Sequence, residues 1–236
     1  ATPLVLDFHG LTSNGTQEIF LTGMNTKADA SGFIAVHPEG TGNSWNAGAC
    51  CDPAAKNMVD DIGFVSAMLD KLQADLCVDT KRVFVTGMSN GGFLSNRIGC
   101  ELASRVAAIA PVASVLVSAT CNPARPMPVL AFHGTMDNLV DYYGKGQYGF
   151  PSAQADIDAW AMRDGCTDTA VQTFQKDDTT CMTRSACKGG AEVTLCTVDG
   201  GGHTWPGGYP IPGGKTTMAI KATDAMWDFF VKHPMQ

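Results

Sequence analysis

Residues 82–93 read RVFVTGMSNGGF, and this stretch changes character halfway along its length. Its first half is rich in β-branched and aromatic residues and predicts a strand, whereas residues 93–102 predict a helix. The pattern G-x-S-x-G stands at the junction, at residues 87–91. A serine on such a sharp turn is lifted above the sheet, and its flanking glycines let strand and helix approach each other. Backbone N–H groups at the start of the helix can then bind an oxyanion, so Ser89 is predicted to be a nucleophile.

The rest of the chain alternates short apolar runs with helical periods. Strands are predicted over residues 4–8, 33–36, 106–112, 129–132 and 193–198, and helices over 25–30, 62–76, 153–163 and 216–231. Residues 39–53 are rich in Gly, Asn and Pro and predict a long ordered loop. The alternation indicates an α/β fold, with a mostly parallel central sheet, helices on both faces and a site at the carboxyl ends of the strands. No repeat or linker divides the chain, so residues 1–236 are expected to form a single domain.

Composition excludes several classes of protein. Of the 236 residues, 44% are hydrophobic and 17% are charged, which is enough apolar material for a sizeable core. No apolar run reaches the length of a membrane-spanning helix. The net charge of −7, without any basic run, argues against nucleic acid and anionic membrane surfaces as partners.

Nine cysteines are a high number for a cytosolic enzyme. No C-x-x-C pair and no zinc-type spacing occurs, so we expect disulfides in a secreted protein and no metal site. The sequence opens on strand residues and not on a signal peptide, which predicts a mature or trimmed chain. An odd number of cysteines leaves at least one thiol free or paired outside the chain.

Some disulfide pairings are favoured by position. Adjacent cysteines rarely bridge each other, so Cys50 and Cys51 are expected to have different partners or to leave one thiol reduced. Cys77 is one candidate partner for either of them, and Cys100 can pair with Cys121. Two more bridges are expected among Cys166, Cys181, Cys187 and Cys196.

A nucleophilic serine needs a general base, and the base needs a carboxylate that orients it. When the serine stands on a strand-to-helix turn, the chain order is serine, then the acid, then the histidine. His203 lies in the glycine-rich loop 200–208, directly after the predicted strand 193–198. Glycines on both sides let this loop carry an imidazole over the sheet edge. His233 follows the last helix and is expected to be solvated, so His203 is the predicted base.

The acid is expected after the strand 129–132, where HGTMDNLVD follows at residues 133–141. Asp137 is the preferred candidate. Asp141 is the rival but fits a cap or turn residue, and Asp199 is a third candidate. His133 stands near the acid, yet its place at a strand end predicts a buried, hydrogen-bonded histidine and not a base.

Two N–H donors are needed where negative charge develops during acyl transfer. Asn90 follows the nucleophile and offers its backbone N–H. The second donor usually comes from the loop after an early strand, where the Leu11 N–H is the best candidate and Gly10 lets the backbone approach. Trp45 and Trp205 flank the predicted site; they are candidate substrate-binding residues, with burial as loop anchors as the alternative.

Taken together, the motifs resemble the secreted α/β-hydrolase esterases grouped as the poly(3-hydroxybutyrate) depolymerase and feruloyl esterase family. The matching segments are LDFHG (6–10), NSWNAGACC (43–51), VDDIGF (59–64), GMSNGG (87–92), HGTMD (133–137) and GHTWPGG (202–208). The resemblance implies an α/β-hydrolase fold, a triad of Ser89, Asp137 and His203, and metal-free ester hydrolysis. Members of the family usually carry one or two further strands before the segment equivalent to residues 4–9.

The resulting prediction is a secreted, monomeric serine carboxylesterase that works through an acyl-enzyme and needs no cofactor. Feruloyl esters of plant cell-wall polysaccharide are the preferred substrate, because no extra module for an insoluble polymer is recognised. Aliphatic polyesters of the poly(3-hydroxybutyrate) type and acetylxylan are the alternatives. Two alternatives lie outside this class of enzyme. One is another reaction of the same fold, such as that of a peptidase or thioesterase, and the other is a non-catalytic binding module on a hydrolase fold.

Overall fold

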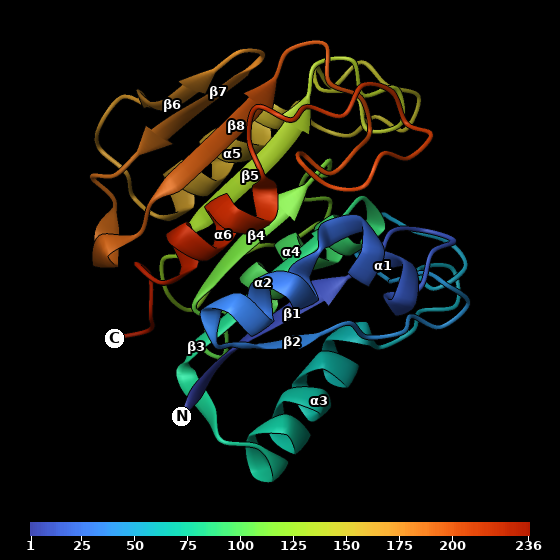
Figure 1. Ribbon diagram of the computed structural model, residues 1–236, viewed down its shortest axis with the longest axis vertical. Coiled ribbons are helices and arrows are strands. Elements are labelled where there is room, and N and C mark those ends of the chain that lie inside the picture. Colours follow the sequence, from blue (N-terminus) through green and yellow to red (C-terminus); the bar gives the residue numbers. More distant parts are fainter.

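A computed structural model describes residues 1–236, and it is built on one eight-stranded sheet (Figure 1). The strands are β1 (Thr2–Phe8), β2 (Ile34–Val36), β3 (Val78–Met88), β4 (Ala108–Val112), β5 (Val129–Gly134), β6 (Val171–Lys176), β7 (Thr179–Arg184) and β8 (Val193–Val198). Their order is β2-β1-β3-β4-β5-β8-β7-β6. The first six strands of this order pair in parallel, and β7 and β6 add an antiparallel edge.

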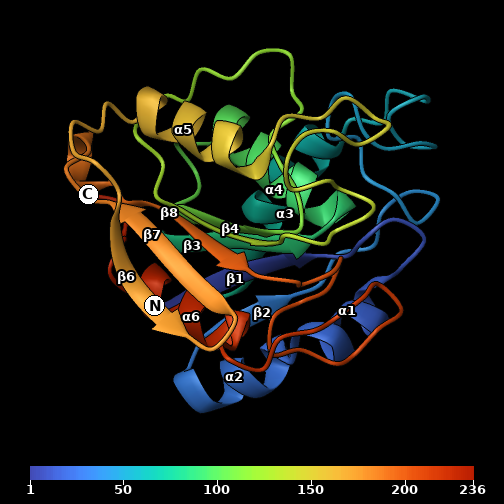
Figure 2. The ribbon, with the colours of Figure 1, turned by 90° about the horizontal axis from the view of Figure 1, so that it is seen from above.

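Helices cover both faces of the sheet (Figure 2). They are α1 (Gly15–Thr22), α2 (Met24–Ser31), α3 (Asp61–Asp75), α4 (Asn90–Glu101), α5 (Ala153–Arg163) and α6 (Ala222–Phe230), with a short 3-10 helix at Lys188–Gly190. In Figure 2, α3, α4 and α5 lie on one face and α1, α2 and α6 on the other. None of these helices has the length and apolar character that a membrane crossing requires.

Alternation along the strands divides the core into two layers. In β1, Leu4, Leu6 and Phe8 join the apolar cluster under α3, α4 and α5, whereas Val5 joins the cluster under α2 and α6. The same division recurs in β3 and β5. Because successive side chains of a strand point to opposite faces, a parallel sheet covered on both sides requires these nearly continuous apolar runs.

The α/β fold expected from the sequence is therefore observed, with three local differences. α1 and the hairpin β6–β7 were not predicted, and the last helix begins at Ala222 and not at residue 216. β6 is exposed along most of its length and has a polar sequence, VQTFQK, so it lacks the apolar signal of a buried strand. Asp60 caps α3 by accepting from the Gly63 N–H, and Asp61 accepts from the Asn46 N–H.

Four disulfides are formed, and one of them contradicts the sequence-based expectation. Cys50 and Cys51 bridge each other, and Cys77 is an exposed free thiol, so neither pairs as predicted. Cys77 directly precedes β3, whereas Cys50 and Cys51 line the cleft with Ser89 at the other end of that strand, so Cys77 is not placed to pair with either. Cys100–Cys121, Cys166–Cys187 and Cys181–Cys196 agree with the expected pairings, the last of these joining β7 to β8.

Reduction of the disulfides is expected to lower the free energy of unfolding by several kcal/mol. The Cys181–Cys196 bridge alone spans 15 residues, and a loop of that length contributes about 3 kcal/mol in the chain-entropy description. Guanidinium unfolding with and without a phosphine reductant measures the difference. The Cys77→Ser variant is the control and should respond as the wild type does; an unchanged midpoint under reductant would contradict the expectation.

Candidate active site

Ser89 stands on a tight turn between β3 and α4. Its backbone has φ 54° and ψ −120°, in the left-handed region that non-glycine residues avoid. The turn packs directly against the end of β1: a Cβ atom at Gly87 would lie 2.5 Å from the Phe8 carbonyl oxygen, and one at Gly91 would collide with the same oxygen. Only glycine fits at both positions, which explains the G-x-S-x-G spacing physically.

The structure brings His203 and Asp137 together on loops that follow adjacent strands, β8 and β5. His203 Nδ1 lies 2.7 Å from Asp137 Oδ2, and both side chains are buried. The other carboxylate oxygen of Asp137 accepts from the backbone N–H groups of Leu139 and Val140, at 2.9 and 2.8 Å. The acid is therefore fixed in place and oriented toward the imidazole.

Burial alone would raise the pKa of Asp137, but its neighbours reverse the effect. Hydrogen bonds from His133 and His203 hold the pKa of this carboxyl well below its usual range. Asp137 is thus ionised at neutral pH. An ionised acceptor keeps the proton of His203 on Nδ1, which leaves Nε2 free to accept a proton.

The rival residues are placed elsewhere. Asp141 accepts from the Tyr143 and Lys145 N–H groups, as a turn residue does. Asp199 accepts from the Thr135 hydroxyl on the edge of the same loop region. His133 is buried, and its Nε2 lies 2.7 Å from the Val140 carbonyl oxygen, in the structural role expected for it.

The expectation for His233 was wrong. This histidine is buried, and its Nδ1 donates to the Phe229 carbonyl at 2.8 Å. Its ring also packs on the Phe229 ring, with centroids 4.3 Å apart. Burial occurs because the chain turns back onto the sheet immediately after α6, which the amphipathic pattern of the helix did not reveal.

Ser89 and His203 line one open cleft of about 1080 Å³ at the carboxyl ends of the strands. Gly10 and Leu11 border the cleft on the β1 side, and Cys50 and Cys51 form part of another wall. Aromatic side chains contribute a third wall, with Phe93 against Phe150 and Phe150 stacked on Tyr148. The vicinal cysteines and this aromatic wall were not predicted as cleft residues.

The loop after β1 is held by contacts on both sides of Leu11, where the Thr12 N–H on the far side donates to the Asn43 carbonyl at 2.8 Å. His9 accepts the Gly40 N–H on Nε2 at 3.0 Å, so its Nδ1 donates to the Gly10 carbonyl at 2.8 Å. The backbone N–H groups of Leu11 and Asn90 donate to no acceptor within the protein. The backbone N–H of each residue is thus available to a bound ligand. The two residues belong to the two segments that meet at Ser89.

The tryptophans lie outside the cleft, which corrects the sequence-based hypothesis that Trp45 and Trp205 bind substrate. Both are fully buried. Trp45 pairs through its backbone N–H and carbonyl with the side-chain amide of Asn90, at 2.7 and 2.9 Å, and its indole donates to the His9 carbonyl. Trp205 donates its indole N–H to the Thr223 hydroxyl at 3.1 Å. Each tryptophan anchors a loop of the site. Its large apolar ring is buried and its indole N–H is hydrogen-bonded, and together these fix a loop that has no helix or strand.

No cluster of three or more His, Cys, Asp or Glu side chains is arranged to hold a metal ion. No protein-family model matches the chain. Among curated proteins, it is similar to feruloyl esterase B of Piromyces equi, with 35% identity over 221 residues, covering 86% of this chain and 40% of that relative. Feruloyl esterase C of Emericella nidulans is 27% identical over 211 residues, covering 89% of this chain and 68% of the relative.

The chain is therefore similar to feruloyl esterases over most of its length. A solved acetyl xylan esterase from Aspergillus awamori shares the fold, with a TM-score of 0.69, 15% identity and coverage of 98% of this chain and 89% of that one. The chain spans less than half the length of the Piromyces relative. The similarity to these esterases agrees with the resemblance that the sequence motifs indicated.

Replacing Trp205 by Phe is expected to lower stability without changing substrate preference. The variant loses the hydrogen bond to Thr223, which is worth roughly 0.5–1.5 kcal/mol, and some buried volume. The ratio of kcat/KM for an aromatic and an aliphatic ester should remain that of the wild type. Tyr148→Ala, which alters the cleft wall, is the matched comparison and should change that ratio. A changed ratio of kcat/KM in Trp205→Phe would show that Trp205 contributes to substrate binding.

Proposed function

We propose that the chain is a serine carboxylesterase with Ser89 as nucleophile, His203 as base and Asp137 as the acid that orients it. The observation that carries the proposal is the 2.7 Å contact of buried His203 and Asp137 at the edge of the cleft that holds Ser89. Relatives named as esterases support the same reaction class. The four disulfides favour an oxidising compartment, so we propose that the enzyme is secreted.

The reaction proceeds in two acyl-transfer steps. His203 Nε2 takes the proton of the Ser89 hydroxyl as the oxygen attacks the ester carbonyl, and Asp137 stabilises the imidazolium. The N–H groups of Leu11 and Asn90 donate to the oxyanion of the tetrahedral intermediate. His203 then gives its proton to the departing alcohol, and a water activated by His203 releases the acid from Ser89. The residues of the chain supply every proton transfer.

For the substrate, we propose a hydroxycinnamoyl ester such as a feruloyl ester of a polysaccharide. The aromatic wall formed by Phe93, Phe150 and Tyr148 offers faces and edges on which a phenyl ring can pack. Relatives named feruloyl esterase point to the same acyl group. An acetyl ester is the second candidate, because the structural neighbour from Aspergillus awamori is an acetyl xylan esterase.

Hydrolysis of methyl ferulate, compared with that of p-nitrophenyl acetate and butyrate, tests both the proposed reaction and the proposed acyl group. We expect efficient cleavage of the ferulate, and Ser89→Ala should abolish cleavage of all three esters. Ser13→Ala, in the same cleft, is the control and should retain activity. Cleavage of only the acetate would transfer the assignment to acetyl esters. Full activity of Ser89→Ala would exclude Ser89 as the nucleophile, and an inactive wild type would favour a non-catalytic binding module.

Asp137→Asn should lower kcat by about 10³–10⁴-fold with little change in KM, because an amide cannot hold the imidazole in the required tautomer and charge state. Asp141→Asn is the matched control, since this nearby carboxylate only caps a turn. Its kcat should stay near the wild-type value. Equal losses in the two variants would show that the acid has been assigned incorrectly.

A further inference from the structure

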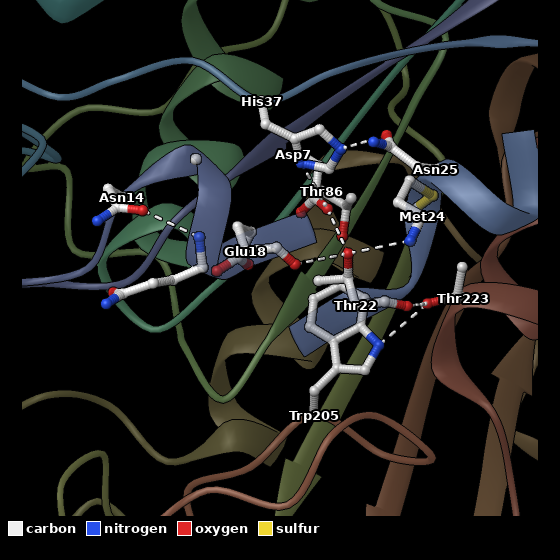
Figure 3. A network of polar contacts seen from close by, with 12 residues as sticks. Asp7, Asn14, Glu18, Thr22, Met24, Asn25, His37, Thr86, Trp205 and Thr223 are labelled. Carbon is white, nitrogen blue, oxygen red and sulfur yellow. Dashed lines mark hydrogen bonds and ion pairs between the residues drawn. The ribbon is translucent and has the colours of Figure 1, made fainter. Parts of the chain in front are cut away.

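A second carboxyl group that the triad does not use lies below the site. Glu18 belongs to α1, is 1% exposed and lines the floor of the cleft together with Gly10, Met88 and Ser89. Figure 3 shows its side chain in the same group of polar residues as Asp7 on β1 and Thr22 at the end of α1. A buried glutamate is costly unless it is paired or neutral, so its position beside the nucleophile calls for a physical reason.

The Glu18 carboxyl faces two backbone segments at once. Burial raises the pKa of Glu18 well above its ordinary value, and the nearby backbone N–H groups of Met88 and Gly10 oppose that rise. Neither forms a hydrogen bond of normal geometry, and both carboxyl oxygens are without a partner. Gly10 directly precedes Leu11, and Met88 directly precedes the turn of Ser89 and Asn90. The Glu18 carboxyl therefore lies between the two segments that carry the free N–H groups.

We propose that Glu18 is a positioning residue for ester hydrolysis, whose carboxyl group bridges the loop that carries the Leu11 N–H and the turn that carries Ser89. The proposal rests on the proposed esterase function, because the two segments matter together only if an oxyanion forms between them. It requires the bridging carboxyl to be neutral. A negative charge at this position would oppose the charge that develops on the substrate oxygen.

The surroundings favour a neutral carboxyl. Burial, and next the charge of Asp7, raise the pKa of Glu18 above its ordinary value. Burial also raises the pKa of Asp7 to about 7, although a hydrogen bond from the Thr22 hydroxyl, 2.8 Å from Asp7 Oδ2, opposes the shift. Two carboxyls in one buried site do not ionise together readily, so the pair retains a proton.

No cation neutralises the pair. His37, after β2, has its Nδ1 3.4 Å from Asp7 Oδ2, and burial lowers the pKa of this imidazole to about 4. His9 is engaged with backbone groups of its own loop, and its pKa is also lowered by burial. His203 lies on the cleft and is paired with Asp137. No Lys or Arg forms an ion pair with Glu18 or Asp7.

The sign of the pH effect follows from these neighbours. Because the raised pKa keeps a proton on the pair at neutral pH, kcat should fall as pH rises above neutrality and that proton is lost. Glu18→Gln replaces the neutral carboxyl by a neutral amide of the same shape, so its kcat near pH 6 should stay within about threefold of the wild type and the alkaline fall should disappear.

Two further variants separate positioning from charge. Glu18→Ala removes the bridge and should lower kcat about tenfold to a hundredfold, with KM changed much less, as for partial loss of an oxyanion donor. Asp7→Asn removes the like charge, so Glu18 should ionise more readily and the fall in kcat should move to lower pH. Glu39→Gln, an exposed carboxylate on the loop beside α1, is the control and should keep the wild-type profile.

The experiment is the pH dependence of kcat and KM on p-nitrophenyl acetate for the wild type and these variants, with unfolding midpoints measured alongside. An alkaline fall that persists in Glu18→Gln, or a kcat of Glu18→Ala equal to that of the wild type, would overturn the proposal. If Glu18→Ala does not fold, the comparison of Glu18→Gln with Asp7→Asn still decides it. A wild type inactive on every ester would instead refute the proposed function.

Discussion

The contact between the β3–α4 turn and the last carbonyl of β1 is the constraint on which the rest of the site depends. Gly87 and Gly91 allow this contact, since a side chain at either position would strike the Phe8 oxygen. The contact forces Ser89 into its left-handed conformation and brings the loop after β1 beside the nucleophile. One steric requirement thus places both the proposed nucleophile and the two proposed N–H donors.

Trp45 extends this arrangement to a loop that has no helix or strand of its own. Its backbone pairs with the Asn90 amide, and its indole donates to His9. Asn90 and His9 are therefore joined through one buried residue, by its backbone on one side and its indole on the other. Other polar groups of the long segment between β2 and α3 are satisfied by α3 and by the segment itself, as in the bonds from the Asn46 N–H to Asp61 and from the Ala54 N–H to Ser44.

Much of this architecture follows from the sequence because it rests on short-range rules. α5 and β8 were predicted with their observed bounds, since a clear helical period and a buried strand run mark them. The G-x-S-x-G turn, the acid after β5 and the base after β8 also carry local signals, and the structure places those residues together. α1 was missed because its eight residues include polar Glu18 and Thr22 on the buried side, which removes the apolar stripe that predicts a helix. The burial of Trp45, Trp205 and His233, and the pairing of Cys50 with Cys51, depend on contacts between distant segments that a single sequence does not reveal.

The hydrogen bonds of Thr223 couple the unfolding of distant parts of the protein. This hydroxyl accepts from Trp205 in the loop of the base and donates to the Thr22 carbonyl at 2.6 Å, across 201 positions of sequence. Tyr209 adds a second link by donating its N–H to the Leu21 carbonyl. The C-terminal helix therefore connects the loop of His203 to the end of α1, and a local opening of α6 would release both. The two sides of the cleft should exchange their amide hydrogens as one cooperative unit, although they lie at opposite ends of the chain.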